Sequence, residues 1–164
     1  VVITLLEGAV LGGGFGLACI SDVAIADKNA KLSMPETGLG IIPAQIAPFV
    51  VSRIGLTQAR RLALLGERID GEEAKDLGIA HYLTHGSDEM EAKLADTLKK
   101  VKRCAPKANA VTKSLMLKVG HVEHETLLDG AADDFAASLQ RDEGQEGTLA
   151  FLEKRLPFWA TSKG

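Results

Sequence analysis

Three consecutive glycines mark the first stretch whose residue types could do chemistry. Gly12, Gly13 and Gly14 stand directly before an apolar run of helical length, residues 15–20. Glycine in regular structure costs roughly 0.5–1 kcal/mol relative to alanine, so three in a row indicate a backbone with positive φ or a close approach. A helix that begins here would direct free N–H groups at an oxyanion. The stretch predicts an anion-stabilising turn, although a simple packing turn has the same composition.

The second stretch places one carboxylate in an apolar loop. Glu36 lies between Pro35 and Thr37, in a loop bracketed by Pro35 and Pro43. The apolar residues of this loop are Met34, Leu39, Ile41 and Ile42. Hydrocarbon around a carboxylate suits a group that transfers protons near neutral pH. Glu36 is therefore the candidate general acid/base, and an ordinary exposed loop glutamate is the alternative.

Other catalytic patterns fail on spacing. No G-K-[ST] follows the glycines, and the third glycine of a G-x-G-x-x-G would fall on Leu17, so no nucleotide-phosphate signature is present. His121 and His124 are three residues apart without a third ligand nearby, so we expect no metal site. No G-x-S-x-G occurs, which argues against a Ser-His-Asp hydrolase.

Composition indicates one soluble domain's worth of chain. The 164 residues are 46% hydrophobic and 25% charged, with a net charge of −3 and no Lys/Arg cluster, which argues against nucleic-acid binding. Cys19 and Cys104 have neither zinc spacing nor a disulfide framework, so we expect free thiols in a reducing cytoplasm. Residues 1–6 are too short to span a membrane and lack the features of a signal peptide, so we expect no membrane partner.

The periodicity predicts strands first and helices afterwards. The expected strands cover residues 1–6, buried on both faces, 23–26 and 31–33. The expected helices cover residues 45–54 and 57–65, broken at Gly55, and 71–77, capped by Asp70. Arg53 is expected on a solvated face. Asp22 is expected to accept backbone N–H groups, a structural role.

The last third predicts helices with apolar stripes. Helix periodicity alone favours Phe135 and Phe151 as core residues, and Lys154 as a solvated helix end. Asp142 with Gln145 predicts a cap for a helix over residues 143–154. We therefore expect residues 1–80 to carry the site and residues 81–164 to form a helical region.

The order of these pieces resembles the enoyl-CoA hydratase/isomerase, or crotonase, superfamily. Residues 6–43, LEGAVLGGGFGLACISDVAIADKNAKLSMPETGLGIIP, are similar to its NG-x-A-x-GGG-x-x-L-A-x-x-CD and P-E-x-x-x-G-x-x-P blocks. The resemblance implies an α/β fold, a partial crotonase-like ββα spiral followed by a helical region that packs trimers together. Because members extend further at the N-terminus, it also implies that this chain is the C-terminal two-thirds of such a protein.

The resemblance also implies roles for individual residues. Glu36 aligns with a catalytic glutamate, and Gly13 with the glycine whose N–H binds the thioester oxygen. The positions implied to contact the substrate or its coenzyme A are Gly12, Gly14, Pro35, Phe135, Phe151 and Lys154. The implied partners are an acyl-CoA thioester and further copies of the chain, as a trimer or a dimer of trimers. Coenzyme A enters as part of the substrate, and no tightly bound cofactor is expected.

Two departures from the family pattern bear on the reaction. Gly16 stands where two-carboxylate hydratases carry a second glutamate, and residues 43–51, PAQIAPFVV, replace a glycine-rich stretch. The missing side chain would leave room for a bulky acyl chain. The segments look most like the branch that hydrates branched or carboxylated esters such as isohexenylglutaconyl-CoA in acyclic terpene breakdown. A hydratase is expected; a Δ3,Δ2-enoyl-CoA isomerase and a non-catalytic acyl-CoA-binding subunit are the alternatives.

Overall fold

The first four strands of the chain alternate between two small sheets. The computed structural model describes residues 1–161, in two compact units: Val1–Asp96, and a second that begins at Thr97. In the first unit the strands are β1 Ile3–Leu6, β2 Ala9–Leu11, β3 Val23–Asp27, β4 Lys31–Ser33, β5 Arg68–Ile69 and β6 Tyr82–Thr84. Its helices are α1 Gly13–Ile20, the 3-10 helix η1 Glu36–Leu39, α2 Ala47–Leu65 and α3 Gly71–Asp76, and it also holds the first part of α4 Ser87–Lys102.

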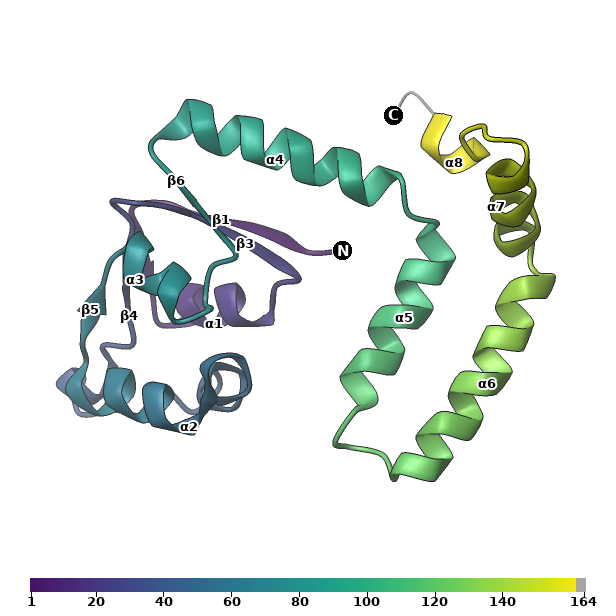
Figure 1. Cartoon of the computed structure of the whole chain (residues 1–164). Coiled ribbons are helices and arrows are strands. Elements are labelled where there is room, and N and C mark those ends of the chain that lie inside the picture. Colours follow the sequence, from purple (N-terminus) through teal and green to yellow (C-terminus); the bar gives the residue numbers. More distant parts are fainter. Residues whose placement is uncertain (162–164) are drawn as a thin grey trace. The chain divides into compact units, whose positions relative to one another are not determined.

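The strand pairing builds a ββα spiral (Figure 1). One sheet has the order β1-β3-β6, all parallel, and the other has the order β2-β4-β5, with β2 and β4 parallel. Thus β1 and β2 followed by α1 make one turn, and β3 and β4 followed by η1 and α2 make the next. Each turn adds one strand to each sheet. This confirms the expected α/β spiral.

The core of the first unit lies between the strands and the first two long helices. Phe15 of α1, Leu32 of β4 and Leu62 of α2 are among its fully enclosed side chains. The strand expected over residues 1–6 is not buried on both faces, because Val2, just before β1, and Leu5 within it remain exposed while Leu6 is buried. A run of apolar residues predicts that something covers the strand, but not that this chain supplies the cover.

Most local predictions in the first unit are confirmed. The strands at residues 23–26 and 31–33 are β3 and β4, and α2 is kinked at Gly55, whose φ is 75°. Asp70 caps α3 by accepting the N–H groups of Glu72 and Glu73 at 3.1 and 3.0 Å. Strand β2 was not expected, and the loop after Pro35 contains the 3-10 helix η1. Strand β2 has only three residues, between Gly8 and Gly12, and these are too few to show the alternation by which a strand is recognised in a sequence.

The prediction that Arg53 lies on a solvated face is wrong, because the side chain is half-buried. Its guanidinium donates to the carbonyl oxygens of Gly78 and Ile79, both at 2.9 Å, and to that of Ser21 at 3.3 Å. The side chain thus fastens α2 to the end of α1 and to the loop after α3. The expected structural role of Asp22 is confirmed, because its carboxylate accepts the N–H of Val2 at 2.7 Å.

Both cysteines are free thiols in the structure, as expected. Cys19 is buried in α1, and this burial raises the pKa of its thiol to about 11 despite the opposing charge of Arg53. Cys104 is exposed. Among residues 1–161, no helix combines the length and the apolar character needed to cross a membrane.

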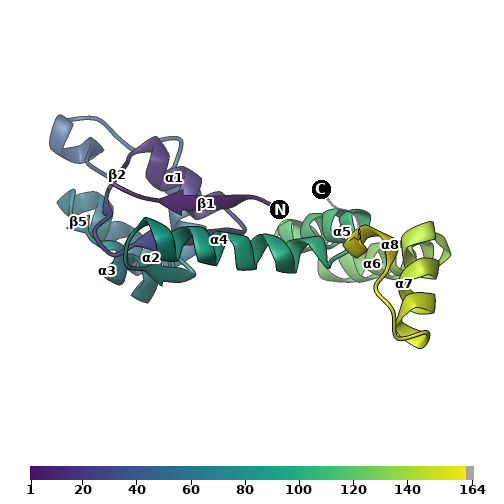
Figure 2. The same cartoon turned by 90° about the horizontal axis from the view of Figure 1, so that it is seen from above.

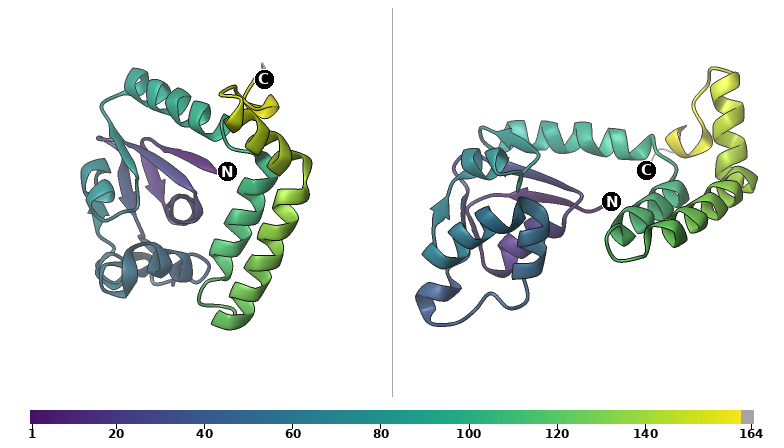
Figure 3. Two further views of the ribbon diagram at one scale, coloured as in Figure 1. Left: turned by 45° about the vertical axis from the view of Figure 1, so that its right-hand side comes forward. Right: turned by 60° about the horizontal axis from the view of Figure 1, so that its bottom comes forward.

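The second unit is a set of helices. They are α5 Pro106–Lys118, α6 His124–Gln140, α7 Asp142–Leu152 and α8 Phe158–Thr161, after the last residues of α4. Helices α5 and α6 run antiparallel and lie side by side (Figure 3). Helix α7 begins after Arg141 without a side-chain cap, so the predicted cap by Asp142 and Gln145 is wrong. Glu143 of that turn caps α5 instead, by accepting the N–H groups of Lys107 and Ala108.

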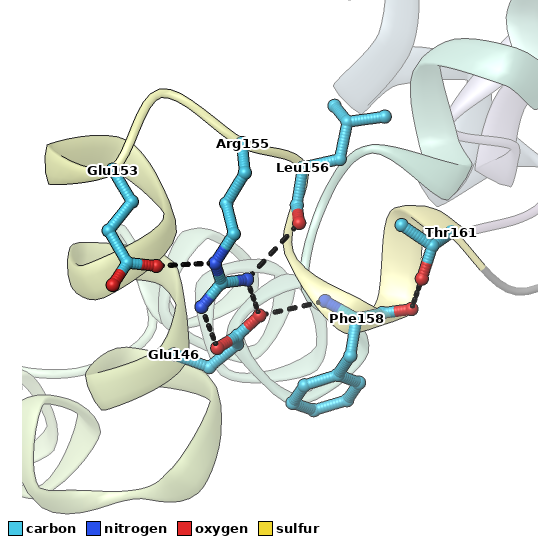
Figure 4. A network of polar contacts seen from close by, with 6 residues as sticks. All are labelled: Glu146, Glu153, Arg155, Leu156, Phe158 and Thr161. Carbon is cyan, nitrogen blue, oxygen red and sulfur yellow. Dashed lines mark hydrogen bonds and ion pairs between the residues drawn. The ribbon is translucent and has the colours of Figure 1, made fainter.

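A polar network around Arg155 connects α7 with α8 (Figure 4). The Arg155 guanidinium donates to both carboxylate oxygens of Glu146, at 2.6 and 2.8 Å, and to Glu153 at 2.6 Å. Glu146 also accepts the N–H of Phe158 at 3.0 Å. These contacts lower the pKa of Glu146, chiefly through Arg155. The network joins α7 to α8, and it explains how a four-residue helix is held.

Candidate active site

A glycine with positive φ precedes the first helix. Gly12 has φ 50° and ψ −113°, a conformation that residues with a side chain rarely adopt, and its N–H donates to Ser33 O of β4 at 3.1 Å. The first helical hydrogen bond of α1 runs from Gly16 N to Gly12 O at 3.1 Å. The N–H groups of Gly13 and Gly14 therefore precede the helical ladder, at the positive end of the helix dipole.

The Glu36 carboxylate lies against this turn. A Cβ atom on Gly12 would lie 3.1 Å from Glu36 Oε1, so the glycine also makes room for the acid. Glu36 Oε2 is buried and has no hydrogen-bond partner among the described residues. A buried polar atom without a partner costs about 1–3 kcal/mol, more when charged. Such an atom in a folded protein indicates a site that a ligand or water completes.

Hydrogen bonds fix the loop that carries Glu36. The Thr37 hydroxyl donates to Ala63 O near the end of α2 at 2.7 Å, and Ile41 N donates to Glu36 O at 3.1 Å. In Figure 2 this segment, which connects β4 to α2 in the sequence, is the slate-blue loop that extends away from the strands before it returns to α2. Pro35, which precedes Glu36, is half-buried and caps η1. The backbone thus holds the carboxylate at the glycine turn.

The space beside Gly16 is filled, which corrects the expectation of a roomier pocket. A Cβ atom on Gly16 would lie 3.0 Å from Ile46 Cβ and closer still to Ile46 Cγ2. Ile46 therefore takes the place of a side chain at residue 16. Sequence reasoning singled out residues 43–51 as unusual but did not find this contact, because the two residues are 30 positions apart in the sequence.

The remaining predicted site residues lie in the second unit. Phe135 on α6 and Phe151 on α7 are 66% and 82% exposed, so the core role that periodicity favoured for them is wrong. Lys154 follows α7 with φ 55° and its N–H donates to Phe151 O at 3.2 Å, as at a helix end. The structure groups Glu36 with Gly12 and the start of α1, and places these three residues in the helical unit.

A hollow of about 410 Å³ lies among α5, α6, α7 and α8. Val111, Leu115, Phe135, Leu139 and Trp159 supply much of its lining, and Glu36 and the glycine turn do not contribute. Among residues 1–161, no three His, Cys, Asp or Glu side chains gather in a way that could hold a metal ion.

Known proteins share this architecture. A curated Bacillus subtilis (strain 168) protein named "Probable enoyl-CoA hydratase" is 34% identical over 157 residues, 95% of this chain and 61% of that protein. Mouse "Methylglutaconyl-CoA hydratase, mitochondrial" is 30% identical over 159 residues, 94% of this chain and 51% of that protein. A crystal structure of an enoyl-CoA hydratase/isomerase from Marinobacter aquaeolei superposes with a TM-score of 0.94 at 59% identity, covering 96% of this chain and 60% of that one.

The chain thus spans between half and about three-fifths of the length of these relatives. The family pattern described as enoyl-CoA hydratase/isomerase matches residues 1–162, nearly the whole sequence. With the spiral of strands and the glycine turn facing Glu36, this match shows that the chain belongs to the enoyl-CoA hydratase/isomerase family.

Proposed function

We propose that the whole protein is an enoyl-CoA hydratase-type lyase that adds water to an α,β-unsaturated acyl-CoA thioester. The observation that carries the proposal is the Glu36 carboxylate against Gly12, with one oxygen buried and unpaired. A carboxylate beside the start of a helix can exchange protons with a substrate whose carbonyl oxygen lies at that helix start. Hydratase names among relatives of 30–34% identity support the same reaction.

The steps follow from these groups. Glu36 takes a proton from water while the water oxygen bonds to the β carbon of the enoyl group. The electron pair of the C=C bond then forms a double bond between the α carbon and the thioester carbon, and the pair of the carbonyl bond moves onto the thioester oxygen, where the N–H of Gly13 stabilises the negative charge. The protonated Glu36 returns its proton to the α carbon, so both elements of water are added and the carboxylate is restored. One such N–H donor is worth about 2.7–4 kcal/mol in other enzymes.

The acyl group in this proposal is branched or carboxylated. The wall formed by residues 43–51 is rich in apolar side chains, and the mouse relative is named for methylglutaconyl-CoA. Coenzyme A takes part as a portion of the substrate. Phe135, Phe151 and Lys154 are proposed to contact its adenine and phosphate end.

The exposed apolar faces support self-assembly. Leu128, Phe135 and Leu139 of α6 are 55%, 66% and 51% exposed, an apolar stripe that a second copy would cover. We propose a trimer or a dimer of trimers. Light scattering of the full-length protein at micromolar concentration should then report three or six subunits, and a monomer alone would contradict the assembly.

Isomerisation of a 3-enoyl-CoA is the second candidate, because one carboxylate is enough to move a proton from C2 to C4. Ile46 occupies the space that an acidic side chain at residue 16 would need, so a second carboxylate is not available there. The full-length protein is therefore offered a branched 2-enoyl-CoA, crotonyl-CoA and a 3-enoyl-CoA. Hydration of the branched ester in preference to crotonyl-CoA supports the proposal. Double-bond migration without hydration would favour the isomerase, and no turnover would favour a non-catalytic subunit.

The decisive variant is Glu36→Gln. The amide keeps the shape but cannot exchange protons at neutral pH, and general acid/base catalysis is typically worth about 100-fold or more. We expect at least that loss in kcat with acyl-CoA binding retained. Glu7→Gln is the matched control, because Glu7 is exposed at the corner between β1 and β2. A Glu36→Gln protein with more than about a tenth of the wild-type rate would remove Glu36 from this role.

A further inference from the structure

Ile46 occupies the place that a side chain on α1 would need. Gly16 is buried one helical turn after Gly12, and its N–H donates to Gly12 O at 3.1 Å. Cα–Cβ bonds in a helix tilt toward its N-terminus, so a side chain at residue 16 would point back toward the turn that Glu36 touches. That direction leads into Ile46, whose Cβ would lie 3.0 Å from the added Cβ and whose Cγ2 would lie closer.

The backbone prevents Ile46 from withdrawing easily. Its N–H donates to Pro43 O at 3.2 Å, and its carbonyl accepts the N–H of Val50 at 3.0 Å, in the first turn of α2. The side chain is half-buried and packs against the core of the first unit. Isoleucine is branched at Cβ and has few χ1 choices. Any side chain at residue 16 must therefore displace a group that is fixed from two directions.

We propose that Ile46 is a specificity-determining residue of the site. It excludes a side chain from residue 16, so Glu36 moves protons without help from a second carboxylate on α1. Its hydrocarbon surface takes the place of that carboxylate, and an apolar branch of the acyl chain packs there. This inference rests on the proposed function, because it assigns the wall of the same site.

A cycle of substitutions in the full-length protein tests the exclusion. Gly16→Ala should lower the midpoint of thermal unfolding by about 2–12 °C. Overpacking a core typically costs about 1–3 kcal/mol of unfolding free energy, and each kcal/mol lowers the midpoint by about 2–4 °C in a protein of this size. The same change made together with Ile46→Ala, which removes the nearer Cγ2 but keeps the Cβ at 3.0 Å, should lower the midpoint by less, relative to Ile46→Ala alone, than it does in the wild-type background. Equal midpoints for Gly16→Ala and wild type would overturn the exclusion.

The catalytic arm uses the pair Gly16→Glu and Ile46→Ala. The double variant lacks the Ile46 Cγ2 atom and so has more room for a second carboxylate, and its kcat/KM for crotonyl-CoA hydration should show a second titrating limb in the pH profile. The ratio of kcat/KM for crotonyl-CoA to that for a branched 2-enoyl-CoA should rise at least about ten-fold, since general acid/base assistance is worth 100-fold or more. An unchanged ratio together with one titrating limb would overturn the specificity role.

Ile54→Ala is the matched control. Ile54 lies on α2, the helix that Ile46 caps, and like Ile46 it is half-buried and packs against the same core, but it does not lie over Gly16. It should lower the unfolding midpoint without changing the substrate ratio or the pH profile. A wild-type protein that hydrates neither ester overturns the proposed function and the specificity role with it. The thermal cycle still decides in that case whether Ile46 excludes a side chain at residue 16.

Discussion

The carboxylate of Glu36 rests on the one face of Gly12 where any other residue would carry its Cβ atom, at 3.1 Å from Oε1. Residue 12 must therefore be a glycine for two reasons: its φ is 50°, and the Glu36 carboxylate approaches it closely. Residues 12 and 36 come from successive turns of the spiral, which pair β2 with β4 in parallel. The sheet register thus sets the distance between the acid and the start of α1.

The first prediction concerns Gly12→Ala. Left-handed backbone costs roughly 1–2 kcal/mol for a residue with a Cβ, and the new methyl group would also push on Glu36. We expect a loss of at least about 1 kcal/mol in the free energy of unfolding, measured in urea, and reduced hydration. Gly14→Ala is the control, since its Cβ would meet only Val10 Cγ1 at 3.9 Å, an ordinary contact inside a helix. Equal losses in the two variants would contradict this account.

The second prediction isolates the N–H of Gly13. Proline is tolerated at the first position of a helix, so Gly13→Pro should remove the N–H while α1 persists. Gly13→Ala keeps the N–H, and its Cβ would find no atom within 4 Å. We expect kcat to fall about 100- to 1,000-fold for proline, as for other oxyanion donors, with most activity kept by alanine. Circular dichroism checks that both variants fold, and equal activities would argue against an oxyanion role.

Local signals in the sequence were enough to predict the glycine turn and α1, whereas the choice of Glu36 as the candidate acid also needed the family resemblance. Their meeting point depends on the pairing of β2 with β4, and β2 is too short to recognise by pattern. Arg53 shows a second limit, because its three carbonyl partners come from residues 21, 78 and 79, and no local pattern encodes such a reach. Phe135 and Phe151 show a third: periodicity identifies an apolar face but not what covers it.

The third prediction concerns the dependence of stability on pH through His81. Its Nδ1 accepts the N–H of Ala24 at 2.9 Å, and the Arg53 guanidinium lies 3.2 Å from the same nitrogen. Partial desolvation of the ring and the charge of Arg53 lower the pKa of His81 below its usual value near 6.5. The unfolded chain therefore binds a proton at a higher pH than the folded protein does. Stability is full above about pH 6.5 and decreases as the pH falls toward the lower, folded value.

Two variants separate titration from bonding at this position. His81→Asn cannot take up a proton in this range and retains an acceptor for the Ala24 N–H, so its unfolding free energy should fall less steeply from pH 7 to 5. His81→Ala also loses the titration but leaves the N–H unpaired, so it should be less stable than His81→Asn at every pH. Urea titrations at several pH values measure both effects. A slope in His81→Asn equal to that of wild type would assign the pH dependence to other groups.

The last prediction concerns the cap that α7 provides for α5. Ala105 offers no side-chain acceptor and Pro106 has no N–H, so the first free N–H groups of α5 belong to Lys107 and Ala108. The Glu143 carboxylate accepts both, at 3.0 and 3.1 Å. Loss of a helix cap typically costs about 0.5–2 kcal/mol, so Glu143→Ala should lower the free energy of unfolding by that amount. Glu143→Gln keeps one oxygen acceptor, so it should recover part of the loss. Asp142→Ala is the control: Asp142 lies in the same turn but is exposed, and its loss should cost less than that of Glu143. If Asp142→Ala proved as costly as Glu143→Ala, the effect would come from charge at the start of α7 rather than from the cap on α5.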